Sequence, residues 1–454
     1  MENTPQFPKT NLFSFLQESM TIKLIIIGML VLVLLIPTAW ISFLIEERQQ
    51  RAESVVDEIS SKWSDNQTLT GPILAIPYFY TETTLNNFGV EKKEPKSAYA
   101  FFLPEKLQVD GIVEPQVRRR GIFDAVVYTS SVKAKATFKS PDLAALDIPE
   151  EQVDWSNARL IFGITDLRGL SSTPDVRAGA QALDTEPSAD IYERPQVNAV
   201  AVSGVIARTG WSSASDFNGD VTFDLKLKGS QALNFIPAGR ETSIALEGPW
   251  GSPSFDGAFL PEQHEVTRDS FTAKWNILHY NRPFPQQWTG NEKVLSGSEF
   301  GVNLLVPVDQ YQKSERTSKY AVLIILLTFV SLFLVEITQK IRVHPFQYTL
   351  IGAALIVYYT LLLSISEQLG FNTAYWIATL ATVTLVSLYA RSFLRKFQHV
   401  TLFSLMLTVF YAFIFVIIFQ QDLSLLIGSI GLFIVVGLLM YFSRRIVWYK
   451  EASN

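Results

Sequence analysis

The chain has 454 residues, a formal net charge of −5 and no cysteine. Charged residues make up 18% of it and hydrophobic residues 48%, whereas about 25% charged is usual for soluble domains. The lack of cysteine excludes disulfides, thiol nucleophiles and Cys-ligated zinc. The acidic balance argues against the basic face that nucleic-acid binding requires. The composition therefore predicts a protein that lies partly in a membrane and binds no nucleic acid.

The N-terminal part predicts a membrane anchor followed by a stalk. Residues 1–21 form a polar tail, which suits either an amphipathic segment on the membrane or a frayed end. Residues 22–45 are apolar, broken chiefly by Lys23, Pro37 and Ser42, and reach the ~20 residues that cross a bilayer. A cleaved signal peptide has a shorter core of ~7–15 residues. We therefore predict an uncleaved signal anchor, with residues 46–68 continuing it as a helical stalk.

A mainly β domain is predicted over residues 69–317. Apolar and polar residues alternate there with the period of half-buried strands. The clearest cases are 132–138, 221–227 and 271–277, and shorter β-prone runs are 73–79, 98–103, 160–165, 199–206 and 302–306. Residues 170–195 and 281–299 are polar and rich in Pro, Gly and Ser, so we expect long loops. One β-sandwich or two smaller β subdomains both fit this length.

Residues 318–446 predict a block of five transmembrane helices, and residues 447–454 a short tail. The apolar runs are 320–337, 346–363, 373–390, 400–419 and 423–442. With the anchor they make six crossings, so both termini lie on one side. The turns on that side are basic: Lys340, Arg342, Arg391, Arg395, Lys396, Arg444, Arg445 and Lys450. The positive-inside rule makes that side cytoplasmic and the β domain periplasmic.

One intramembrane residue is a candidate functional site. Glu336 lies near the end of an apolar run, and an ionisable residue in lipid suggests function. It is also about one helical turn from water, so its carboxylate can reach toward Lys340 instead. The hydroxyls of Thr379, Thr382 and Ser387 and the pair Ser424 and Gly428 favour helix packing over a pore.

Enzyme signatures are weak throughout the chain. Ser130 and Lys133 match the S-x-x-K pattern of acyl-enzyme formation, but the pattern lies on an alternating strand rather than at the start of a helix. His264 and His279 could meet in space, but two lone histidines on a β domain are usually structural and do not indicate a metal site. Residues 118–120 are a basic run that suits a solvated turn better than a headgroup site. The sequence predicts no cofactor, no metal and no catalytic residue.

Several stretches resemble the CreD family of inner-membrane "cell envelope integrity" proteins of Gram-negative bacteria. They are GPILAIP (71–77), FLPEKLQVDG (102–111), PSFDGAFLP (253–261), DQYQKSERTSKYAVLIILLTF (309–329), HPFQY (344–348) and LLLSISEQLGF (361–371). The resemblance extends over nearly the whole chain and implies a role in envelope stress, with tolerance of colicins and response to β-lactams. It also implies expression under a two-component sensor and regulator. It brings no established catalytic residue.

The sequence thus predicts an α+β membrane protein with six transmembrane helices and a large β-rich periplasmic domain inserted between the first and second. Its expected role is non-catalytic binding or scaffolding of an unidentified periplasmic or envelope partner. Alternatives are a transporter or channel regulated by the β domain with Glu336 as the coupling carboxylate, and an envelope hydrolase with Ser130 as nucleophile. A sensor is disfavoured, since cytoplasmic loops of about ten residues are too short for a folded output domain.

Overall fold

The computed structural model divides the chain into two compact units. The helical unit contains Met1–Ala52 and Val308–Asn454, and the β unit contains Glu53–Pro307. The structure describes residues 20–85, 91–188, 203–290, 295, 297–304, 309–339, 341–394, 396–420 and 424–443. The division places residues 309–317 with the helices, whereas the sequence groups them with the β domain.

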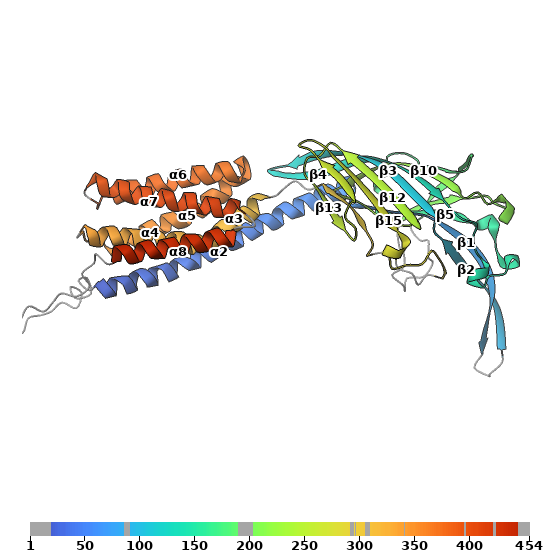
Figure 1. Cartoon of the computed structure of the whole chain (residues 1–454), viewed down its shortest axis with the longest axis horizontal. Coiled ribbons are helices and arrows are strands. Elements are labelled where there is room, and N and C mark those ends of the chain that lie inside the picture. Colours follow the sequence, from blue (N-terminus) through green and yellow to red (C-terminus); the bar gives the residue numbers. More distant parts are fainter. Residues whose placement is uncertain are drawn as a thin grey trace, which may run out of the picture. The chain divides into compact units, whose positions relative to one another are not determined.

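The β unit consists of two large sheets (Figure 1). The nine-stranded sheet contains β1 (Gln67–Leu85), β2 (Glu91–Phe102), β5 (Arg159–Ile164), β8 (Thr185–Ser188), β9 (Gly204–Arg208), β11 (Ala232–Phe235), β13 (Pro253–Gly257), β16 (Gln287–Thr289) and β17 (Phe300–Leu304). The eight-stranded sheet contains β3 (Lys106–Arg120), β4 (Phe123–Thr137), β6 (Asp175–Ala178), β7 (Gln181–Leu183), β10 (Asp220–Ser230), β12 (Glu241–Gly248), β14 (Gln263–Val266) and β15 (Phe271–Leu278). Pairing is antiparallel except between β1 and β11 and between β3 and β12.

The two sheets share one hydrophobic core. Phe162 of the first sheet stacks on Phe223 of the second, with ring centroids 4.1 Å apart. The predicted alternation is confirmed, because the apolar members of 132–138, 221–227 and 271–277 are buried. Strand β15 alternates buried and exposed residues along its whole length, as expected for a strand with one face on a core. A single core supports one β-sandwich rather than two separate β subdomains.

The prediction of long loops at 170–195 and 281–299 is wrong in part. Short strands β6, β7 and β8 lie within the first range and β16 within the second. Their few apolar residues, such as Val176 and Ala178, face the core at the edge of a sheet. Strands this short have too few alternating positions to be distinguished from polar loops. Residues 189–195 and 199–202 of the predicted runs lie outside the described residues.

Seven helices are described in and around the helical unit (Figure 1). They are α2 (Met20–Trp63), α3 (Asp309–Lys319), α4 (Ala321–Thr338), α5 (Pro345–Leu369), α6 (Phe371–Ala390), α7 (Phe397–Phe419) and α8 (Ser424–Ser443). Among the residues described, α2, α4, α5, α6 and α7 are long and apolar enough to cross a membrane. Helix α8 contains no charged residue, and its crossing remains a prediction.

Local sequence explains where these helices begin and end. The His344 side chain accepts a hydrogen bond from the backbone N–H of Phe346 at 3.2 Å, and Pro345 occupies the first turn of α5. A side-chain cap followed by proline is typical of a helix start. Gly370 separates α5 from α6 with a φ of +76°, a conformation that glycine adopts without steric cost. The two helices therefore form a tight hairpin.

The C-terminal end of α2 is fastened to the β unit by a polar cluster around Asp166. Its carboxylate accepts hydrogen bonds from the Ser64 hydroxyl and the Asp65 N–H, both at 3.1 Å. Arg168 donates to the same carboxylate at 2.8 Å and to the Ser61 carbonyl at 2.8 Å. Arg168 thus satisfies a carbonyl in the last turn of α2, as basic residues often do at helix ends. The hydrogen bond from Arg168 lowers the pKa of Asp166 to about 2, despite its burial.

Replacement of Asp166 should weaken the β unit in a pH-dependent way. Asp166→Asn removes charge-assisted hydrogen bonds and should lower the free energy of unfolding by about 2 kcal/mol at pH 7. Because the folded pKa is about 2 and the unfolded pKa is ~3.9, this stabilisation is complete above about pH 5 and is mostly lost as the pH falls toward 2. Tryptophan fluorescence during denaturant unfolding of the full chain measures both effects.

Asp175→Asn is the matched control, because this aspartate forms an ion pair with Arg177 whose side chains are both more than half exposed. It should change the free energy of unfolding little. Equal stability of Asp166→Asn and wild type at pH 7 would contradict the assignment.

Candidate functional site

Glu336 lies inside the helical unit with three hydrogen-bond donors. It is 5% exposed and near the C-terminal end of α4. Its carboxylate accepts from the Lys23 ammonium group, from the Val343 N–H at 2.9 Å and from the Tyr348 hydroxyl at 3.0 Å. The predicted alternative partner, Lys340, lies outside the described residues. The carboxylate therefore joins α2, the connection after α4 and the start of α5.

A second ion pair lies further along α2. Arg48 donates two parallel hydrogen bonds to Glu367, at 2.8 Å from Nε and 2.7 Å from Nη2. The Tyr311 hydroxyl of α3 donates to the same carboxylate at 3.1 Å. The Glu367 side chain is 7% exposed, so it requires these partners. A planar two-bond contact between arginine and carboxylate is also the stronger kind of ion pair.

The two ion pairs are spaced to suit a bilayer. Lys23 and Arg48 are about 38 Å apart along α2 at a rise of ~1.5 Å per residue, and the hydrocarbon layer is ~30 Å thick. The two acidic partners also lie at opposite ends of the helices. Glu336 is near the C-terminal end of α4, where the chain turns into α5, and Glu367 is near the far end of α5. Both cations lie at the ends of the apolar stretch, where the cost of burying charge is smallest. This arrangement fastens the first helix to the others at both ends.

The chemistry available at Glu336 is limited by these contacts. A coupling carboxylate in a transporter must release and rebind a proton or cation, and here the loss of its charge would leave Lys23 without its anion. The geometry accordingly fits a fastening between helices. A role in transport stays a hypothesis about this residue.

The prediction of helix packing through small and hydroxyl-bearing residues is supported at Ser387 of α6 but not at Gly428 of α8. Ser387 and Ser404 form a hydrogen bond of 2.6 Å between α6 and α7, as the packing prediction expects. Gly428 has no neighbouring atom within 4 Å of where a Cβ would lie, so it makes no close helix contact among the described residues. Gly431 makes that contact instead, against the Phe413 ring of α7.

Ser130 is poorly placed for a nucleophile. It lies on β4, is 5% exposed, and donates its hydroxyl proton to the Ile112 carbonyl at 2.9 Å. Lys133 is on the exposed face of the same strand, and its Nζ lies 4.0 Å from Oδ2 of Asp224. The serine and lysine of the S-x-x-K pattern thus point to opposite faces, as residues three apart on a strand must. No base is in contact with Ser130 among the described hydrogen bonds.

The two histidines of the β unit do not meet. His264 on β14 pairs in register with Ala273 on β15, and His279 follows six positions further along the chain. A strand rises ~3.3 Å per residue, so about 20 Å separates them. His264 packs on Phe255 and His279 on Tyr280. In the described ranges, no group of three or more potential metal ligands occurs.

The basic run 118–120 forms local contacts at the end of the β3–β4 hairpin. Arg119 bonds Asp124 at 2.7 Å, and Arg120 lies 2.5 Å from Glu58 of α2. The Arg118 guanidinium lies over the Trp63 ring, 5.1 Å from its centroid. All three arginines therefore help to hold the hairpin or the end of α2, so the run is more than a solvated turn.

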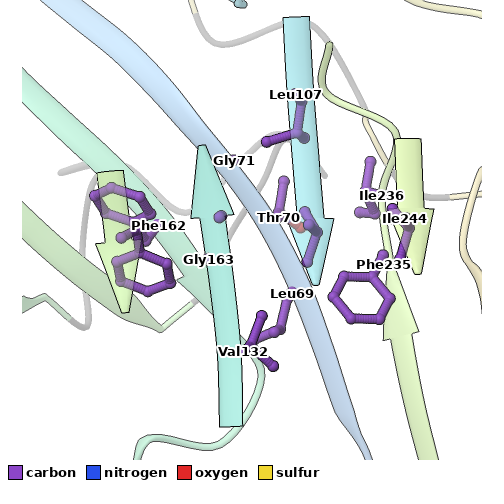
Figure 2. Close-up of a pocket in the computed structure, with 13 residues that line it drawn as sticks. Leu69, Thr70, Gly71, Leu107, Val132, Phe162, Gly163, Phe235, Ile236 and Ile244 are labelled. Atoms are coloured by element: carbon purple, nitrogen blue, oxygen red, sulfur yellow. The ribbon is translucent and has the colours of Figure 1, made fainter. Parts of the chain in front are cut away.

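A cavity lies between the two sheets (Figure 2). Its volume is about 20 Å³, and apolar side chains from both sheets line it, including Leu69, Phe235, Leu107 and Ile244. Binding pockets for small molecules have volumes of ~300–1,000 Å³. A space of one water-sized volume with apolar walls stays dry. We interpret it as a packing gap beside Gly71, where β1 shifts register against β5.

Strands β1 and β2 continue as a two-stranded β arm, residues 79–85 and 91–99. The two strands pair in register from Leu74 with Phe102 to Leu85 with Glu91. Pairing of β1 with β5 ends at Ala75, and pairing of β2 with β16 includes only 100–102. Figure 1 shows the two strands running on together beyond their neighbours. Phe79 and Tyr80 are 53% and 37% exposed on the arm.

Sequence reasoning found Glu336 but missed its partners and the second ion pair. Lys23 and Glu336 are 313 positions apart, and Arg48 and Glu367 are 319 apart. No periodicity links residues at such separations. The only available signal was that each cation and each acid ends an apolar run.

We expect the Lys23–Glu336 contact to show strong thermodynamic coupling. Glu336→Gln should destabilise the protein much more in the wild type than in a Lys23→Met background, with a coupling free energy of about 1–3 kcal/mol. The reason is that the single change leaves the half-buried Lys23 cation unpaired. Thermal and denaturant unfolding of all four proteins in lipid nanodiscs measure the cycle.

The exposed pair of Lys92 and Glu94 provides the control cycle, with side chains 67% and 43% exposed. Its coupling should stay below about 1 kcal/mol. Additive effects of Lys23→Met and Glu336→Gln would refute the fastening role.

Comparison with known proteins identifies the family of the chain. A family model described as "Inner membrane protein CreD" matches residues 19–449. The inner membrane protein CreD of Escherichia coli (strain K12) is 32% identical over 431 residues, which is 92% of this chain and 91% of that protein. The resemblance seen in the sequence is confirmed: the chain belongs to the CreD family of inner membrane proteins.

Proposed function

We propose that this CreD-family protein supports cell envelope integrity, and the envelope-stress response to β-lactams and colicins, by non-catalytic binding in the periplasm. The helical unit would hold the protein in the inner membrane, and the β unit would contact a periplasmic or envelope partner. Family membership supports the envelope role. The family description names an inner membrane protein.

The proposed orientation has six crossings, both termini in the cytoplasm and the β unit in the periplasm. Five helices already have the length and composition of spans, and α8 would supply the sixth. The contacts of Lys23 with Glu336 and of Arg48 with Glu367 agree with helices that alternate in direction. The basic turns, including Arg342 and Arg391, favour a cytoplasmic location for the end of the bundle near Lys23.

The β arm is the observation that carries the binding proposal. Both of its strands have an outer edge without a neighbouring strand among the described residues. Open strand edges are sites where an extended segment of a partner can add as a further strand. Exposed Phe79 and Tyr80 lie at the base of the arm, and aromatic side chains are favoured at protein interfaces. We infer a partner with an extended polypeptide segment.

The alternatives have less support. A transporter or channel with Glu336 as coupling residue requires a carboxylate that changes partners, and this one has three donors. A hydrolase based on Ser130 requires an accessible hydroxyl, and this one is buried and bonded to a backbone carbonyl. Neither geometry favours the alternative over a binding role.

A single experiment tests both location and binding. The chain has no cysteine, so Tyr80→Cys creates one reactive thiol. A membrane-impermeant maleimide that carries a photoactivatable group should label it in cells with a permeabilised outer membrane. Illumination should then produce a crosslinked species of higher mass, whose partner is identified by mass spectrometry.

Two control variants make the result decisive. Tyr280→Cys carries the probe at another exposed aromatic position of the β unit, 82% exposed, and should be labelled without the same crosslink. Ser392→Cys, in the turn after α6, should be labelled only after the inner membrane is opened. Labelling of Ser392→Cys but not Tyr80→Cys, in cells whose outer membrane alone is permeabilised, would overturn the orientation. Identical crosslinks from Tyr80→Cys and Tyr280→Cys would remove the arm as the binding element.

A further inference from the structure

Four tyrosines gather in the interior of the helical unit. Tyr358 and Tyr359 come from α5, Tyr375 from α6 and Tyr411 from α7, and none is more than 2% exposed. The centroid of the Tyr358 ring lies 5.0 Å from that of Tyr359, 6.0 Å from that of Tyr375 and 4.7 Å from that of Tyr411. Three helices that pack against one another therefore contribute phenolic groups to one place.

Two hydroxyls of this tyrosine cluster have no hydrogen-bond partner among the described residues. Tyr375 donates to the Tyr411 carbonyl at 2.7 Å. The hydroxyls of Tyr359 and Tyr411 are buried and form no hydrogen bond with any described residue. The Tyr358 hydroxyl lies near those of Thr379 and Tyr375. The rings of Tyr359 and Tyr411 both contact the Tyr358 ring, so the two unpaired hydroxyls belong to one small region. Their grouping points to something they bind in common.

The other buried tyrosines among the described residues form hydrogen bonds. The Tyr128 hydroxyl donates to the Ala232 carbonyl at 2.7 Å, and Tyr348 and Tyr311 donate to carboxylates at 3.0 Å and 3.1 Å. A buried hydroxyl without a partner is costly, and in a helical bundle surrounded by lipid no outside water can satisfy it. The tyrosine cluster is thus an exception within its own protein.

We propose that the tyrosine cluster binds water molecules between α5, α6 and α7. Each hydroxyl offers one donor and two acceptor positions and carries no charge, so a neutral hydrogen-bonding ligand is the class that fits. Water is the smallest such ligand and bridges several hydroxyls at once. The site lies closer to the Gly370 turn than to His344, since Tyr375 is in the first turns of α6. This site is independent of any partner of the β unit.

Radiolytic labelling of the full chain in nanodiscs tests the site directly. X-rays split water into hydroxyl radicals that react only with side chains next to the water from which they formed. In water enriched in oxygen-18, the rings of Tyr359 and Tyr411 should take up the label several times faster than Tyr348, which is buried but bonded to Glu336. Equal slow rates at Tyr359, Tyr411 and Tyr348, measured by mass spectrometry, would overturn the proposal.

Phenylalanine variants give a second test, because the thermal midpoint should shift in opposite directions with and without bound water. If water bridges the hydroxyls, Tyr411→Phe and Tyr359→Phe leave it with fewer partners, and the thermal midpoint should fall. If the hydroxyls are unsatisfied, their removal should raise the midpoint or leave it unchanged, and that result would refute bound water. Tyr389→Phe, at a partly exposed ring of α6, is the control and should have little effect. Where a variant does not fold, the labelling of the wild type decides.

Discussion

The pairing of charges at the two ends of the apolar part of α2 is the constraint on which the helical unit depends. A lysine and an arginine flank this stretch, and each meets a buried carboxylate from another helix. In lipid, a charge without its partner is far more costly than in water, so the pairs restrict how α2 lies against α4 and α5. The hydroxyl contact of Ser42 with Ser318 at 3.2 Å lies between them and adds a third connection.

The same helix ends in a polar cluster of a different kind. Arg168 donates to the Ser61 carbonyl, one of those that a helix C-terminus leaves unpaired, and Asp166 accepts from the Asp65 N–H just after the helix. The two-sheet core of the β unit begins immediately after this cluster, because Gln67 opens β1 and donates to Ser64 and to the Asp166 carbonyl. The described contacts of α2 up to Ala52 are thus with the helical unit, and its residues from Glu53 on belong to the β unit.

Periodicity accounts for what the sequence predicted well. Alternation with period two located the long strands β4, β10 and β15, and unbroken apolar runs located the helices. Short strands such as β6, next to the edge strand β7, were missed, since two buried residues do not make a recognisable pattern. The sequence singled out Glu336 because acids are rare in apolar runs, but its partner Lys23 comes from the other end of the chain. The tyrosine cluster was missed because tyrosine in an apolar run resembles ordinary core.

Disulfide formation between Ser42→Cys and Ser318→Cys tests the fastening of α2 most directly. The two hydroxyls lie 3.2 Å apart, the chain has no other cysteine, and the change leaves both ion pairs intact. A protease site placed in residues 86–90 would separate the fragments unless the disulfide joins them. We expect rapid joining in the otherwise wild-type chain and much slower joining when Glu336→Gln and Glu367→Gln are added. Fragments that separate in the first case, or join equally fast in both, would contradict the account.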